Sequence, residues 1–153
     1  MEKKFYIDWD NEISREEFIN NILADEDLVK IRSLVISRWG ECYEESCQPI
    51  IDMFAEHAER FAHLESLFVG DMESEECEIS WIQQGDYSRL YAALPNLKKL
   101  TIKGTQGLEL GRNRPRQTGA PGNHLWRCAV WRVCVIAKLS TACVKNTYRL
   151  YWR

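Results

Sequence analysis

The chain has 153 residues, a length that suits one domain, and its apolar content of 45% is enough for a hydrophobic core. The segment 1–111 holds all 23 acids and 11 of the 20 Lys/Arg, a net charge of −12, whereas the segment 112–153 holds nine Lys/Arg and no acid, a net charge of +9. Six cysteines without framework spacing or a secretory signal exclude a disulfide scaffold and predict a reduced, cytoplasmic protein. Three basic residues interrupt the apolar stretch 125–144, which argues against a transmembrane helix.

The N-terminal segment predicts a strand followed by a helix. Residues 5–9 (FYIDW) are rich in aromatic and β-branched side chains, as strands are. Ser14 and Glu17 have the spacing of a capping box, which predicts a helix through Leu23. We expect these two elements to cover the N-terminal end of the domain.

A repeat follows. Residues 31–36, 64–69 and 97–102 align without a gap, and the interval from the first segment to the second equals that from the second to the third. Alternating apolar residues predict three short strands with one buried face, formed by Leu34/Ile36, Leu67/Val69 and Leu100/Ile102. A glycine, at position 40, 70 or 104, helps to end each strand.

Helices are predicted between these strands. After Ser46 and Pro49, apolar residues recur at helical spacing from Ile50 to Phe61, and a second stripe runs from Tyr87 to a stop at Pro95. Strand, helix and strand at a constant period predict an α/β leucine-rich-repeat-like solenoid over residues 1–111. Its short strands should be parallel, its helices should lie on the outer side, and its period is about 33 residues.

One segment resembles a known group of proteins. Residues 70–86 (GDMESEECEISWIQQGD), followed by Leu94-Pro95-Asn96-Leu97, look like bacterial leucine-rich-repeat-like cytoplasmic proteins of unassigned function. Some of those proteins are labelled molybdate metabolism regulators. The resemblance covers about residues 1–111 and implies the same fold, but it supplies no catalytic motif.

Residues 112–153 depart from the repeat and are expected to form a basic, out-of-pattern tail that is disordered or derived from a frameshift. Reading one base later turns the codons of Asn123 and His124 into Ile or Thr codons and the codon of Trp126 into a Gly codon. The shifted frame also permits another Leu-x-x-Leu-x-Ile strand, so the solenoid would be C-terminally truncated. Sequencing the gene tests this, because a downstream region without a repeat-coding frame would remove the hypothesis.

The alternative is that the tail binds a polyanion. Its seven arginines are interleaved with Trp126, Trp131, Tyr148, Tyr151 and Trp152, and such a mixture suits phosphates and bases. A basic amphipathic segment also suits an anionic membrane surface. The tail matches no nucleic-acid-binding module, however, and its apolar residues keep no steady period.

The sequence contains few residues that indicate a catalytic or metal-binding site. Six carboxylates between positions 71 and 86 could attract Ca²⁺ or Mg²⁺, but they match no EF-hand and are typical of a solvated loop. Cys42 and Cys47 lack the second ligand pair of a structural zinc site. A phosphate-binding glycine loop, a nucleophile elbow and a metalloprotease helix are all missing from the sequence. We therefore predict no catalytic residue, no metal and no cofactor.

Three residues are candidates for a binding surface: Trp39, Asp71 and Trp81. Residues just beyond strand ends share one loop edge, where a Trp can anchor a partner. The opposing interpretation buries both indoles; it is favoured for Trp81, whose neighbours Ile79 and Ile82 look buried, and left open for Trp39.

The predicted function is that of a non-enzymatic protein–protein interaction module, or a truncated remnant of a longer protein, whose acidic domain favours a basic partner. The alternative is a regulator, similar to the molybdate metabolism regulators, whose basic tail contacts nucleic acid.

Overall fold

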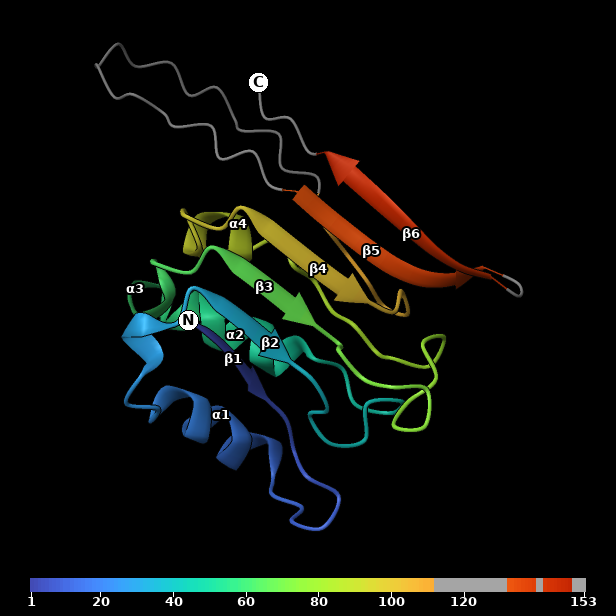
Figure 1. Ribbon diagram of the computed structural model, residues 1–153, viewed down its shortest axis with the longest axis horizontal. Helices are drawn as coiled ribbons and strands as arrows, with labels where there is room; N and C mark the ends of the chain where they lie inside the picture. Colours follow the sequence, from blue (N-terminus) through green and yellow to red (C-terminus); the bar gives the residue numbers. More distant parts are fainter. Residues whose placement is uncertain (112–131, 140–141, 150–153) are drawn as a thin grey trace.

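The computed structural model describes residues 1–111, 132–139 and 142–149. In this part of the chain, six strands form one sheet, and each strand pairs with its neighbours in sequence (Figure 1). The first five strands are parallel, and the sixth is antiparallel to the fifth. The strands are β1 (Glu2–Phe5), β2 (Ser33–Ile36), β3 (Ser66–Val69), β4 (Lys99–Lys103), β5 (Arg132–Leu139) and β6 (Ala142–Arg149). The protein is therefore α/β with parallel strands, as the sequence predicts.

The register of the sheet follows the repeat of the sequence. Ser33 pairs with Ser66, and Ser66 pairs with Lys99, so the offset from β2 to β3 equals the offset from β3 to β4. The inward side chains of these strands are no more than 1% exposed: Leu34, Ile36, Leu67, Val69, Leu100 and Ile102. A slip of one residue would turn all of them to the opposite face, so their burial fixes the register. The three predicted strands and their buried faces are confirmed.

Short helices back the sheet. They are α1 (Arg15–Leu23), the 3₁₀ helix η1 (Leu28–Lys30), α2 (Gln48–Glu56), α3 (Ala58–Phe61) and α4 (Leu90–Ala93). In Figure 1, α2, α3 and α4 lie behind the strands, and α1 lies beside β1. The segment after β3 contains only the four residues of α4 as helix, so the second helix is shorter than the stripe from Tyr87 predicts.

Local sequence explains where α1 and α2 begin. The Ser14 hydroxyl accepts a hydrogen bond from the backbone N–H of Glu17 at 3.1 Å, which caps α1 as predicted. The Ser46 hydroxyl accepts one from the backbone N–H of Gln48 at 3.1 Å, next to a proline in the first turn of α2. At His57 the backbone leaves the helical region, with φ −112° and ψ 37°, and α3 continues the apolar stripe.

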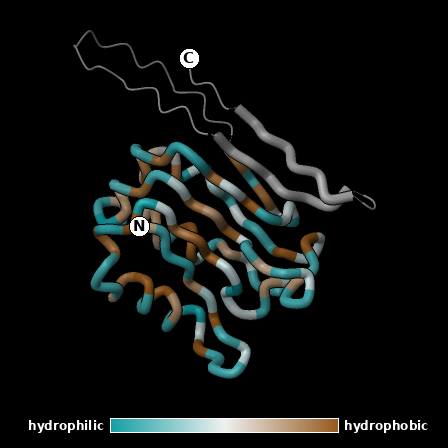
Figure 2. Tube along the Cα trace, in the orientation of Figure 1, coloured by the Kyte–Doolittle hydropathy of each residue, from teal (hydrophilic) through white to brown (hydrophobic). Residues whose placement is uncertain are grey.

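The core lies between the sheet and the helices. Ile50, Ile51 and Phe54 of α2 are no more than 1% exposed, and the rings of Phe54 and Phe61 meet edge to face with centroids 4.8 Å apart. Figure 2 shows hydrophobic stretches along the strands and along the helices that pack against them. Alternation in the strands and helical spacing in α2 thus bring their apolar faces together.

The first strand differs from its prediction. The sequence predicts a strand over residues 5–9, whereas β1 comprises Glu2–Phe5. The strand ends there because β2, its partner in the described sheet, ends at Ile36, the residue that pairs with Phe5. Residues 6–9 therefore belong to a loop, although the backbone N–H of Ile7 still donates to the carbonyl of Arg38 at 2.8 Å.

Two of the described strands, β5 and β6, lie in the basic tail. They form a hairpin, and β5 pairs with β4 at the same offset that relates β4 to β3. The β-branched residues Val133, Val135 and Ile136 favour an extended backbone. The disordered or frameshift-derived tail stays a prediction, and residues 112–131 lie outside the described residues. Within the described part, none of the helices has the length and apolar content needed to cross a bilayer.

Candidate functional site

Loops gather at one edge of the sheet, because parallel strands end on the same side. They are residues 6–14 after β1, 37–47 after β2, 70–89 after β3 and 104–111 after β4, and we call them together the strand-end edge (Figure 1). Backbone hydrogen bonds join neighbouring loops: the N–H of Gln83 donates to the carbonyl of Cys42 at 2.9 Å, and that of Gln84 donates to the carbonyl of Gln106 at 2.7 Å. The strand-end edge is thus a continuous surface.

Four aromatic side chains are exposed on this edge. They are Tyr6 (54%), Trp9 (53%), Tyr43 (45%) and Trp81 (58%). Among the described side chains, the other large apolar ones with comparable exposure are Met1 and Val29, at the opposite end of the strands. Exposed aromatic residues are therefore confined, within the described side chains, to the loops that follow β1, β2 and β3.

Trp81 is one of these exposed residues, so the favoured interpretation of a buried indole is wrong. Its backbone N–H donates to the carbonyl of Glu78 at 2.8 Å, which places Trp81 in a turn of the loop after β3. The next residue, Ile82, is fully buried and packs where Gly104 leaves room, whereas Ile79 is only partly buried. A turn separates the directions of adjacent side chains, so a buried neighbour does not imply a buried Trp81.

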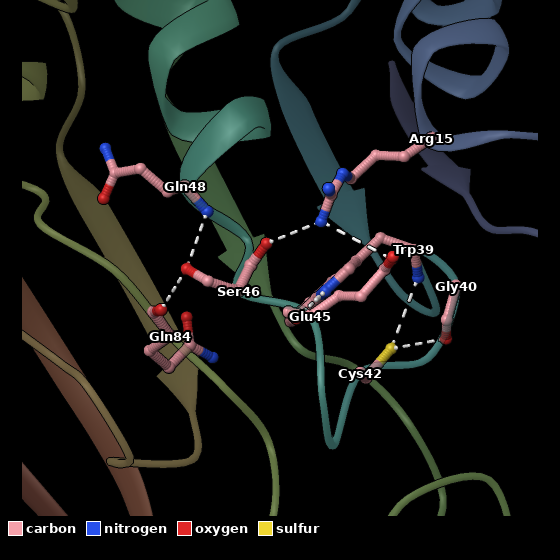
Figure 3. Close-up of polar contacts among 8 residues, drawn as sticks. All are labelled: Arg15, Trp39, Gly40, Cys42, Glu45, Ser46, Gln48 and Gln84. Atoms are coloured by element: carbon pink, nitrogen blue, oxygen red, sulfur yellow. Dashed lines mark hydrogen bonds and ion pairs between the residues drawn. The ribbon is translucent and has the colours of Figure 1, made fainter.

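Trp39 has the opposite environment. Its side chain is fully buried, and its indole Nε1–H donates to the carbonyl of Glu45 at 2.9 Å (Figure 3). The Cys42 thiol accepts from the backbone N–H of Trp39 at 3.4 Å and donates to the carbonyl of Gly40 at 3.2 Å. Trp39 thus shapes the loop after β2 from within, and it does not offer its indole face to solvent.

Asp71 is engaged in an ion pair. Its carboxylate lies 3.0 Å from the Lys4 ammonium of β1. Its carbonyl accepts from the Ser37 hydroxyl at 2.6 Å, and the Lys103 ammonium donates to the carbonyl of Met72. Donors from β1, β4 and the end of β2 thus hold the turn after β3. Of the three predicted binding residues, only Trp81 presents its side chain on the surface without a partner of this kind.

A buried arginine joins the first two loops. The Arg38 side chain is 2% exposed, its guanidinium lies 2.9 Å from the Glu12 carboxylate, and it stacks 3.4 Å from the centroid of the Trp9 ring. One face of Trp9 therefore covers the guanidinium, which explains how a half-exposed indole and a buried charge coexist. Stacking and ion pairing together offset the loss of hydration of the arginine.

A second arginine joins α1 to the loop after β2. Arg15 Nη1 donates to the carbonyl of Ser46 at 3.2 Å and lies 3.4 Å from the Glu45 carboxylate (Figure 3). The Ser46 hydroxyl in turn donates to the carbonyl of Gln84 at 2.6 Å, which reaches the loop after β3. One chain of polar contacts therefore runs from α1 across two loops of the strand-end edge.

The buried polar groups of this region are poor nucleophiles. The Tyr87 hydroxyl donates to the side-chain carbonyl of Gln84 at 2.6 Å, and the Cys47 thiol donates to the same oxygen at 3.2 Å. Burial raises the pKa of Cys47 and the pKa of Cys42 to about 12 and also raises the pKa of Cys77. Thiolates are therefore disfavoured at neutral pH. Within the described residues, no three His, Cys, Asp or Glu side chains are placed to hold a metal ion.

Tyr6, Trp9, Tyr43 and the two arginines are the residues of this surface that the sequence does not reveal. Trp9 is assigned to a strand by its neighbours, and Tyr43 has no periodic context. Tyr6 and Trp9 lie in a loop because β1 ends where its partner β2 ends. Recognising this requires knowing which strands pair, and the sequence does not show it. Placing Arg15 and Arg38 requires knowing that α1 lies beside the loop after β2.

Comparison with protein-family models and with curated proteins gives no match. Among solved structures, the chain is similar to a Bacteroides fragilis protein, a target of the Northeast Structural Genomics Consortium. The two are 41% identical, with a TM-score of 0.64, over 71% of this chain and 31% of that one. The chain thus spans less than a third of the neighbour's length. The predicted likeness to a bacterial protein is confirmed at this level, whereas the leucine-rich-repeat assignment and the regulator label stay predictions.

Proposed function

We propose that this protein is a non-enzymatic binding module of the leucine-rich-repeat type, which holds another protein at its strand-end edge. The repeat assignment is supported by the constant offset that β2, β3 and β4 share and by the helices that return the chain between them. Units of this kind bury their apolar faces against their neighbours only, and they present extended, rigid surfaces to partners.

The observation that carries the proposal is the row of exposed aromatic side chains on the loops after β1, β2 and β3. Tyr6, Trp9, Tyr43 and Trp81 each leave about half of their surface in water. Aromatic side chains bring a large contact area at a small cost in conformational entropy, and they dominate the binding energy of protein interfaces. Hydrogen bonds within and between the loops hold the backbone that carries them.

The charge of the same loops favours a basic partner. The four loops contain thirteen acids and two basic residues, and one of the two, Arg38, is buried. Lysine and arginine side chains suit such a surface, because they form ion pairs with carboxylates and stack on aromatic rings. The long-range attraction raises the rate of encounter with a cationic protein.

Peptide selection tests the proposal. Random peptides are displayed and selected on the intact protein, and those enriched are synthesised and titrated against Trp81→Ala and Val29→Ala. Both replaced side chains are exposed, but Val29 lies at the opposite end of the strands. We expect Trp81→Ala to weaken binding by about tenfold or more and Val29→Ala by less than about twofold. Failure to enrich any peptide, or equal effects of the two variants, would contradict the proposal.

The regulatory alternative, in which the basic tail contacts nucleic acid, stays a prediction, because the tail's side chains lie outside the described residues. A gel shift that depends on residues 112–153 and fades with salt would favour it. The cytoplasmic location and the truncated-remnant hypothesis likewise stay predictions.

A further inference from the structure

A groove of about 620 Å³ lies between α1 and the loop after β2. Its accessible apolar lining comes from Ile13 just before α1, from Ile19 of α1 and from Pro49 at the start of α2, whereas Ile7 and Trp39 lie buried beneath it. The volume exceeds that of a single side chain and falls in the range of sites that hold small ligands or peptide side chains. The groove opens at the strand-end edge, beside the loops that carry Trp9 and Tyr43.

Gly40 lies in the lining of this groove, next to the Glu45 carboxylate. Its φ is +113°, a conformation that other residues rarely adopt, and a Cβ at this position would lie 3.0 Å from the Glu45 carboxylate. That carboxylate forms an ion pair with Arg15, and both residues line the groove. A side chain at position 40 would therefore press on this ion pair.

The charges around the groove decide which ligand it suits. Four carboxylates line it, at Glu12, Glu16, Glu41 and Glu45, against the guanidinium groups of Arg15 and Arg38. Arg38 is 2% exposed and faces Glu12 at 2.9 Å and Glu41 at 4.0 Å, and Arg15 is paired with Glu45. Each guanidinium thus already has a carboxylate partner, and the excess of carboxylates favours cationic groups at the rim.

We propose that the groove accepts an apolar side chain of a partner protein, flanked in the partner's sequence by lysine or arginine residues. The apolar side chain packs between Ile13, Ile19 and Pro49, and the flanking cations pair with the rim carboxylates. The inference rests on the proposed binding function and adds to it the place and the chemistry of recognition. A peptide of this kind can continue along the strand-end edge toward Tyr43.

The test uses the full-length, ¹⁵N-labelled protein and two short peptides with the same charge. One has leucine flanked by lysines, Lys-Lys-Leu-Lys-Lys, and the other has serine in place of the leucine. The leucine peptide should shift the amide resonances of Ile13 and Gly40 and bind at least about fivefold more tightly than the serine peptide. Equal affinity of the two peptides, or no shift at these amides, would overturn the proposal.

Neighbouring glutamates in the first turn of α1 provide matched variants. Glu16 lines the groove and Glu17 does not, although both are exposed. Replacing either glutamate by lysine removes the favourable interaction of a carboxylate with the N-terminus of α1, so this effect is the same for both variants. We expect Glu16→Lys to weaken the leucine peptide by about fivefold and Glu17→Lys to leave its affinity within about twofold. If both variants weaken binding of the leucine peptide equally, the effect comes from net charge, and the proposal that the groove binds the peptide is overturned.

The same variants separate this inference from the proposed function. Selected peptides that lose affinity with Trp81→Ala, but keep it with Glu16→Lys, would place the partner on the strand-end edge and outside the groove, which overturns this inference alone. A response to Glu16→Lys without one to Trp81→Ala would support the groove and contradict the aromatic row.

Discussion

At the scale of single residues, the tryptophans in the loops after β2 and β3 have opposite environments. Trp39 is fully buried with its Nε1–H bonded to a carbonyl, and Trp81 is 58% exposed. We expect Trp39→Ala to lower the free energy of unfolding by about 3–5 kcal/mol, since it leaves a cavity, and Trp81→Ala to change it by less than about 0.5 kcal/mol. Denaturant titration measures both values.

The milder Trp39→Phe serves as a second variant if Trp39→Ala fails to fold. It keeps most of the apolar volume but leaves the carbonyl of Glu45 without its donor, so we expect a loss of about 1–3 kcal/mol. A stability loss on removing Trp81 as large as that on removing Trp39 would contradict the assigned environments.

Cys47 should resist alkylation in the folded protein. It is fully buried, and burial raises its pKa to about 12, so its thiolate fraction at pH 8 is roughly a thousandfold below that of a free cysteine. Iodoacetamide treatment followed by peptide mass spectrometry should find Cys47 unmodified until denaturant is added. Modification of the native protein at the rate of a free thiol would show that the loop after β2 opens readily.

At the scale of elements, glycines after the strands differ in how much room they have. Gly104 and Gly107 both have positive φ, of +98° and +67°, but a Cβ at position 104 would lie 2.7 Å from the Ile82 Cβ, whereas one at position 107 would meet nothing closer than 3.6 Å. We expect Gly104→Ala to cost about 2–4 kcal/mol, from backbone strain plus the clash, and Gly107→Ala about 1 kcal/mol. Thermal melts compare the two; equal costs would mean that the loop after β3 does not pack tightly against the end of β4.

The same elements show what the sequence can predict. Alternating leucines at a constant spacing predict β2, β3 and β4 and their buried faces, and Ser14 predicts the start of α1, because these features depend on a few adjacent residues. The extent of β1 is not predictable in this way, since it depends on where its partner ends. The groove requires the position of α1 against the loop after β2, a contact such as that of Arg15 with Ser46 between residues distant in the sequence.

At the scale of the whole molecule, β5 protects the edge of β4. β5 pairs with β4 in parallel from Arg132 to Ile136, so we expect the amides of residues 132–139 to exchange hydrogen at least about tenfold more slowly than in a free peptide. Hydrogen exchange with mass spectrometry on the full-length protein measures this, with β3 as the internal reference. Exchange at the free-peptide rate would mean that β4 is the edge of the sheet in solution.

The charge asymmetry of the chain predicts that partner binding depends on salt. A peptide selected on the acidic strand-end edge should bind about threefold to tenfold more weakly at about 150 mM than at about 20 mM salt, because ions screen exposed charges. The ratio of the affinities at the two salt concentrations should be the same for Trp81→Ala as for the unchanged protein, since the Trp81 side chain carries no charge. An affinity that salt leaves unchanged would remove the electrostatic part of the proposal.

The order of strands in the sheet bears on how the protein folds as it is synthesised. Every described strand pairs with its neighbours in sequence, and β2, β3 and β4 follow one another at a constant interval along the chain. At ribosomal rates of roughly 5–20 residues per second, about two to seven seconds separate the emergence of one of these strands from that of the next. The segments of β1 and β2 therefore emerge before β3 does, and each later strand can add to the strand that was made just before it.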